Sequence, residues 1–190
     1  MWLRKANQMS DLTDQLLSLG SCDQAIFYIE EEIGSDHTPE AVWFGLDVIE
    51  WMGWLLARTC DYETCTRAFD ALTRWRMMSY PQYAEQWQVI LGTDLAELDR
   101  IYAESSSLDE VWVPHVECKH ALLRGEKVSG FHPIEDFCDE LNEQLAEETD
   151  DDHDYPKRNV ESKHACATVR NAVELDDVLQ GLERATANAA

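Results

Sequence analysis

The sequence predicts an all-α protein: a single helical bundle of about seven or eight short helices, an acidic linker and a C-terminal amphipathic helix. Apolar residues recur at spacings of three and four along most of the chain. Capping residues, glycines and prolines separate these segments, and few segments alternate with a period of two. A length of 190 residues fits one domain, with or without a tail.

The N-terminal third contains three predicted helices. Ser10 precedes the first, and Gly20 ends it. Residues 21–24, Ser-Cys-Asp-Gln, have the spacing of a capping box and begin the second. Residues 38–39, Thr-Pro, begin the third, which we expect to continue unbroken to about Thr59.

The third helix contains the apolar segment 41–57, which reaches the minimum of about 17 residues for a membrane span. Asp47 and Glu50 lie at its middle, and each acid would cost about 2.5–3.5 kcal/mol in a bilayer. The segment is therefore interpreted as a core helix, with no membrane contact. We expect its acids to form structural ion pairs with four available arginines: Arg58, Arg67, Arg74 and Arg76.

The middle of the chain predicts shorter helices. Asp61 caps one that the Tyr-Pro pair at 80–81 breaks, and Gly92 ends the next. Pro114 opens a helix that Gly125 closes. A further short helix begins after Gly92, in the segment before residues 105–113, which we interpret as a connection.

Pro133 opens the last helix of the bundle, whose apolar residues Phe137, Leu141 and Leu145 share one face. We divide the chain into a bundle at 1–147, an acidic linker at 148–162 and a C-terminal helix and tail at 163–190. The C-terminal segment can form one or two helices. It either docks on the bundle or stands apart from it.

Charge is the most unusual property of the chain. It has 38 acidic and 15 basic residues, a net charge of −23 and a pI near 4.4. Such a charge counts against direct binding of nucleic acid or of an anionic membrane. Residues 135–154 contain eleven acids and no base.

Nine of these acids form two groups. The acidic stripe lies opposite the apolar face of the Pro133 helix and consists of Asp136, Asp139, Glu140, Glu143 and Glu147. The acidic run follows it and consists of Asp150, Asp151, Asp152 and Asp154. A solubilising surface would explain acids in general, but solubility of a small domain needs a net charge of only about 2–8.

We therefore expect the acidic stripe and the acidic run to bind a basic protein partner and to inhibit it. The partner would be a nucleic-acid-binding protein or a toxin. The chain is similar to DNA-mimic inhibitors and bacterial immunity proteins in charge and size only. A non-enzymatic role without a cofactor is favoured because no phosphate-binding loop, nucleophile elbow or HExxH motif is present.

Two alternatives remain. Val116–Ala121 and Val160–Ala165 share an E-x-x-H pattern, whose Glu and His lie on one helix face. Two such pairs, with further carboxylates such as Glu50 and Glu97, can build a metal centre in a bundle. The metal ligands would be Glu117, His120, Glu161 and His164. The second alternative is a structural adaptor or homodimer.

The six cysteines, at 22, 60, 65, 118, 138 and 166, form no CxxC pair and match no zinc or disulfide spacing. No apolar segment typical of a signal peptide follows the first five residues. We expect reduced core thiols in a cytoplasmic protein.

Overall fold

The structure is a computed structural model that describes residues 12–33, 38–79, 81, 84–92, 95–103, 113–128, 130–148 and 160–189. The side chains at 79, 84–86, 102, 147–148 and 189 are not described. Every regular element in these ranges is a helix, which confirms the all-α fold.

Residues 12–18 are helical, and ten further helices follow within the described ranges. They are α2 (Asp23–Glu32), α3 (Pro39–Gly45), α4 (Ile49–Thr59), α5 (Tyr62–Ser79), α6 (Ala84–Gly92), α7 (Leu95–Ala103), α8 (Val113–Arg124), α9 (Pro133–Glu148), α10 (Val160–Ala172) and α11 (Leu175–Ala189). The prediction of seven or eight helices is wrong, since these ranges contain 11. One predicted helix is broken in two, and the C-terminal segment forms two helices.

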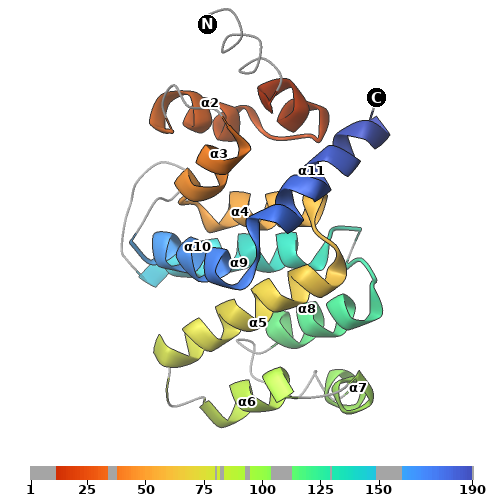
Figure 1. Cartoon of the computed structure of the whole chain (residues 1–190). Helices are drawn as coiled ribbons and strands as arrows, with labels where there is room; N and C mark the ends of the chain where they lie inside the picture. The colour runs from red at the N-terminus through yellow and green to blue at the C-terminus, as the bar shows by residue number, and fades with distance from the viewer. Residues whose placement is uncertain are drawn as a thin grey trace, which may run out of the picture.

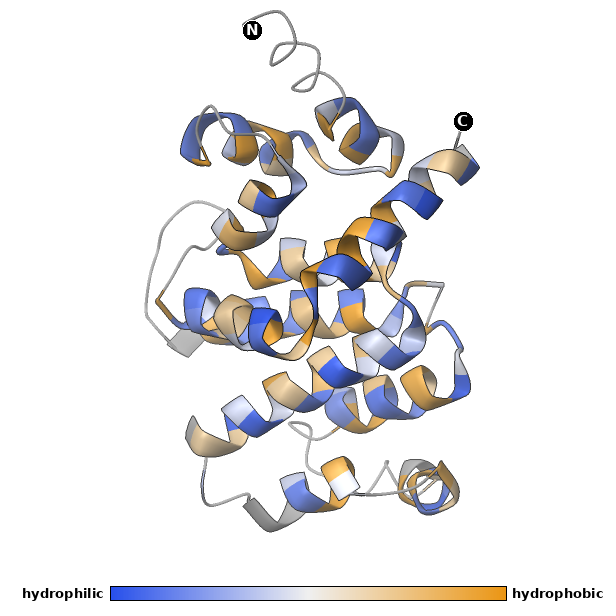
Figure 2. Cartoon of the chain, viewed as in Figure 1, coloured by the Kyte–Doolittle hydropathy of each residue, from blue (hydrophilic) through white to orange (hydrophobic). Residues whose placement is uncertain are grey.

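Helix α9 lies at the centre of the bundle, between α4 and α8 (Figure 1). Helix α5 packs against α8 and α10, and α6 and α7 lie at the end of the molecule far from α2 and α3. Most helices carry both apolar and polar residues around their circumference (Figure 2). Each helix therefore buries one side and exposes another.

The core is densest between α4 and α9. Each helix contributes large aliphatic side chains that are at most 2% exposed: Ile49, Met52, Leu56, Ile134, Leu141 and Leu145. Full burial of such a side chain contributes about 1.5–3 kcal/mol. Gly53 of α4 lies directly against the Cys138 side chain of α9, so these two helices approach closely.

Several predicted helix termini are confirmed. The Thr38 hydroxyl accepts a hydrogen bond from the Ala41 amide (3.2 Å), and the Asp61 carboxylate accepts one from the Thr64 amide (2.8 Å). Gly20 and Gly125 both have positive φ, 86° and 67°, as a helix C-terminus requires.

The predicted capping box at residues 21–24 is wrong. Helix α2 begins at Asp23, its N-cap is Cys22, and no side chain caps it. The Ser21 amide instead donates to the Leu16 carbonyl, and the Gly20 amide donates to the Leu17 carbonyl. Ser21 therefore belongs to the turn that ends the preceding helix, so it cannot begin the next.

The unbroken helix predicted from residue 39 to Thr59 is also wrong, because residues 46–48 separate α3 from α4. Helix α10 stabilises this break. The Ser162 hydroxyl accepts a hydrogen bond from the Ile49 amide (2.9 Å), and the Arg170 guanidinium donates to the carbonyls of Leu46 (2.8 Å) and Trp43 (3.3 Å). These bonds satisfy backbone groups that a continuous helix would have paired internally.

Asp47 forms ion pairs, as predicted, but not with the predicted arginines. Its carboxylate pairs with Lys163 (3.2 Å) and Arg170 (3.8 Å), both on α10. Glu50 accepts a hydrogen bond from the Asn142 amide (3.3 Å). Both acids therefore help to join α4 to its neighbouring helices.

The C-terminal helices dock on the rest of the bundle. Helix α10 packs against α4 and α5, and α11 packs against α4. Residues 160–162, predicted as part of the acidic linker, belong to α10, and residues 149–159 lie outside the described residues. In the described part of the chain, none of the helices combines the length and apolar character that a membrane crossing requires.

The contact between α11 and α4 generates a stability prediction. A Cβ atom added to Gly181 would overlap the Thr59 carbonyl group of α4. We expect Gly181→Ala to lower the free energy of unfolding by about 3 kcal/mol, because backbone atoms cannot move aside cheaply. Urea denaturation followed by circular dichroism measures this change.

The matched control is Gly92→Ala, at a helix end where an added Cβ meets no atom within 4 Å. It should leave stability unchanged or slightly raised. Equal stability of Gly181→Ala and the wild type would contradict the close approach of α11 to α4.

Candidate functional site

The acidic stripe lies on the side of α9 that faces away from the core. Phe137, Leu141 and Leu145 of the same helix are buried. Asp136, Asp139 and Glu143 are exposed, and Glu140 is half-buried. The structure thus brings four of the predicted partner-binding acids onto one face. The Glu147 side chain and all four residues of the acidic run (Asp150, Asp151, Asp152 and Asp154) lie outside the described part of the chain.

Basic residues are placed elsewhere, in ion pairs between helices. Arg58 pairs with Glu135 of α9 (2.6 Å), which lies beside the acidic stripe but is not part of it. Other pairs join α5 to α11, α5 to α8, α7 to α8 and the break before α4 to α10: Arg67–Asp177, Lys119–Asp70, Arg124–Asp99 and Lys163–Asp47. Among the described residues, no salt bridge reaches a carboxylate of the acidic stripe.

The crowded carboxylates shift the protonation of two members of the stripe. Partial burial raises the pKa of Asp139 to about 7, and the carboxylates of Glu50, Glu135, Asp136 and Glu143 raise it as well. Asp139 nevertheless remains exposed to solvent. Both effects disfavour its charged form in the folded protein.

The pKa of Glu140 is raised as well. Partial burial raises its pKa, and the negative charges of Asp136, Glu143 and Glu117 raise it further, although a hydrogen bond from Gln144 lowers it. Glu117 lies on α8, so the negative surface extends from α9 onto the neighbouring helix.

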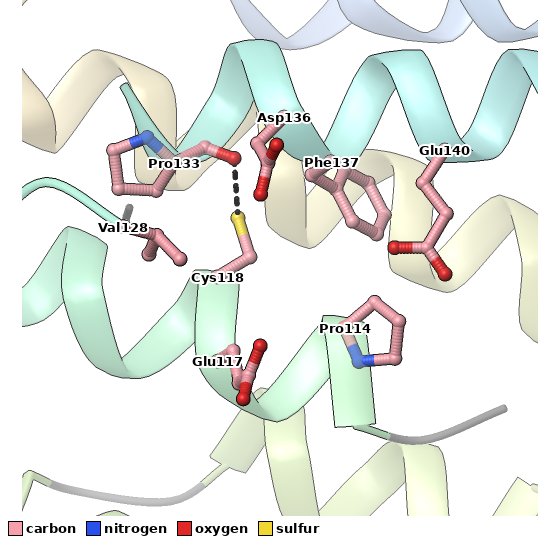
Figure 3. A pocket seen from close by; sticks show the side chains of 8 residues that line it. All are labelled: Pro114, Glu117, Cys118, Val128, Pro133, Asp136, Phe137 and Glu140. Carbon is pink, nitrogen blue, oxygen red and sulfur yellow. Dashed lines mark hydrogen bonds between the residues drawn. The ribbon is translucent and has the colours of Figure 1, made fainter. Parts of the chain in front are cut away.

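A small pocket lies between α8 and α9 on this negative surface (Figure 3). Its void is about 260 Å³, including the part open to solvent. Three carboxylates line it, those of Glu117, Asp136 and Glu140. Apolar groups form the remaining wall: Pro114, Val128, Pro133 and Phe137, together with Cys118. The Cys118 thiol already donates to the Pro133 carbonyl (3.3 Å), so it contributes a fixed wall rather than a free donor.

The four candidate metal ligands do not form one cluster. Glu117 lines the pocket, whereas His120 Nε2 lies 2.7 Å from an Asp99 oxygen of α7. Glu161 and His164 lie next to each other on α10, 3.8 Å apart. No group of three or more His, Cys, Asp or Glu side chains within the described ranges is arranged to hold a metal ion.

The two further carboxylates considered for a metal centre have other partners. Glu97 pairs with Arg100 of its own helix (2.5 Å), and Glu50 accepts a hydrogen bond from Asn142. The sequence repeat therefore corresponds to two separate surface positions in the described structure.

The E-x-x-H pattern identified Glu117 only as a candidate metal ligand and gave no indication that it lies beside the acidic stripe. The length of the connection between the two helices was a signal of this proximity. Only eight residues, 125–132, connect α8 to α9, and a short connection places consecutive helices side by side. That proximity would have predicted that α8 carboxylates adjoin the stripe.

The cysteines are free thiols, and four of them are buried: Cys65, Cys118, Cys138 and Cys166. Cys60 is half-buried and Cys22 is exposed, so the expectation of core positions holds for four of the six. Burial raises the pKa of Cys60 to about 11, which makes its thiolate scarce near neutral pH.

Comparison of the chain with protein-family models, with curated proteins and with solved structures finds no match to any of them. Function is therefore inferred from the side chains of this chain alone.

Proposed function

We propose that this protein is a non-enzymatic interaction module that binds a basic protein partner through the acidic stripe and inhibits it by covering its cationic surface. One observation carries the proposal. The described carboxylates of the stripe share one face of α9 and form no salt bridge with a described cation, while basic residues such as Arg58, Arg67 and Lys119 join helices to one another.

This arrangement costs stability. A carboxylate whose pKa is raised in the folded state prefers to be protonated there, so its charge at neutral pH opposes folding. Solubility does not require such crowding, because dispersed charges serve equally well. A cationic partner would relieve the repulsion, which explains why crowded carboxylates favour binding over solubilisation.

The chemistry of the stripe specifies the class of partner. Carboxylates one helical turn apart are separated by about 5–6 Å, so they present a row of anionic groups. A row of this kind attracts proteins with clustered Arg and Lys, such as nucleic-acid-binding proteins or basic toxins, and speeds their association. Free thiols suit a reducing compartment, so a cytoplasmic location is part of this proposal.

Asp139 provides a test of the stability cost. We expect Asp139→Asn to raise the free energy of unfolding at pH 8 by about 1 kcal/mol, less than the full pKa shift implies, because solvent screens an exposed group. The pKa of Asp139 is about 7 in the folded state, against an ordinary value of 3.8. Its stabilising protonation is therefore complete below pH 3.8 and lost as the pH rises through 7.

The gain from Asp139→Asn should accordingly shrink towards pH 3.5, where Asp139 is neutral in the folded state and mostly neutral in the unfolded state. Glu31→Gln, an exposed position on α2, is the matched control and should give a smaller change at either pH. Denaturant melts of the three proteins at pH 8 and 3.5 measure these differences. A destabilised Asp139→Asn variant at pH 8 would contradict the proposed repulsion.

Partner binding provides the functional test. Immobilised protein should retain a basic protein from lysate at low salt, and the affinity of that purified partner should fall as ionic strength rises. The triple variant Asp136→Asn, Glu140→Gln, Glu143→Gln should weaken binding roughly tenfold, since three exposed pairs contribute about 0.5 kcal/mol each.

The control removes the same number of charges from exposed positions on α2: Asp23→Asn, Glu30→Gln and Glu31→Gln. It should retain most of the affinity. Equal weakening by the two triple variants would show that general charge, not the stripe, attracts the partner. A dimer mass in light scattering, measured without any partner, would instead support the homodimer alternative.

A further inference from the structure

We infer that the pocket between α8 and α9 receives one arginine side chain of the basic partner. This inference rests on the proposed function and adds a defined contact point to it. The pocket combines an apolar wall with three carboxylates, a combination that matches the stem and the head group of arginine.

The apolar part of the wall suits the arginine stem. Pro114 and Val128 are half-buried at the hollow, and the buried Phe137 ring lies behind it (Figure 3). The methylene stem of an arginine packs against apolar side chains while its charged head stays in a polar environment.

The carboxylates suit the charge and the donors of arginine. Asp136 and Glu140 approach the hollow from α9, and Glu117 approaches it from α8 (Figure 3). None of the three forms an ion pair within the described residues. A guanidinium has five N–H donors in a planar fork, so it can serve carboxylates on both helices at once. A lysine ammonium is more strongly hydrated and lacks this planar fork.

The pocket is also held in shape before any ligand arrives. The Phe137 ring contacts the rings of His115 (4.8 Å between centroids) and Phe69 (4.9 Å) in edge-to-face geometry. The bond from the Cys118 thiol to the Pro133 carbonyl joins α8 to the start of α9. A wall fixed in this way loses little conformational freedom on binding, which favours affinity.

The test uses two eight-residue peptides of equal charge, one alternating arginine with glycine and the other alternating lysine with glycine. Binding to the wild-type protein is measured by calorimetry and by NMR at low salt. We expect the arginine peptide to bind about threefold more tightly, because its planar fork can pair with carboxylates of both helices. Its largest chemical-shift changes should fall on Phe137 and Val128.

Two single-charge variants separate the pocket from the stripe. Glu117 lines the pocket but is not part of the stripe, whereas Glu143 belongs to the stripe but does not line the pocket. Glu117→Gln should abolish the preference for arginine over lysine. Glu143→Gln should weaken both peptides to the same extent and leave that preference intact.

A third variant fills the pocket without changing charge. Val128→Phe places a larger side chain in the hollow, and its helical content and melting temperature establish that it is folded. It should bind the two peptides with equal affinity. If Val128→Phe does not fold, the comparison of Glu117→Gln with Glu143→Gln still tests whether the pocket sets the preference for arginine.

Equal affinity of the wild type for the two peptides, or identical effects of Glu117→Gln and Glu143→Gln, would overturn the pocket inference. Salt-dependent binding of both peptides would then still support the acidic stripe as the partner-binding face. Failure of both peptides and of every captured basic protein to bind at low salt would overturn the proposed function as well.

Discussion

The hydrogen bond between the Ile49 amide and the Ser162 hydroxyl joins residues 113 positions apart, and the placement of the central helices depends on it. Together with Arg170, Ser162 satisfies the backbone where the apolar segment leaves α3 and enters α4. A continuous helix would direct α4 elsewhere. Because α4 packs along α9, this contact also fixes which side of α9 is buried. The acidic stripe faces outward as a consequence of α9 burying its opposite side.

A shortage of cations is the second constraint. The chain has 15 basic residues for 38 acids, so most carboxylates cannot be paired internally. Basic side chains such as Arg67, Lys119 and Lys163 join segments that are distant in sequence. Lys119 is buried, so loss of its partner would leave a poorly solvated charge. Among the described acids without a salt bridge, those of the stripe and Glu117 gather on the outer face of α9 and the adjoining pocket. The same distribution of charge thus holds the helices together and leaves a surface that a cationic partner can neutralise.

Local signals were sufficient to predict most helix termini. The cap at Thr38, the cap at Asp61 and the positive φ of Gly20 depend on residues within one turn of the chain. The break at residues 46–48 could not be predicted in this way, because the groups that stabilise it come from α10. Ser21 was misassigned because two turns compete for one residue, and the preceding helix uses it. The acidic stripe followed from helical periodicity, whereas the pocket, formed by side chains of two packed helices, did not.

Protonation acts on folding and on the acidic stripe in different ways. Burial among aromatic rings lowers the pKa of His115 to about 3, so the unfolded chain binds its proton more readily, and stability falls as the pH drops below 6.5. Asp139 has the opposite effect, because its raised pKa makes the folded state gain stability as the pH falls below 7. The Asp139 effect opposes the His115 effect between about pH 4 and 6.5, whereas His132, whose pKa burial lowers to about 4, acts in the same direction as His115. Charge on the stripe declines over the same range, since Asp139 and Glu140 take up protons. Mild acid should therefore weaken attraction to a cationic partner through the stripe, while the two histidines govern the loss of stability in acid.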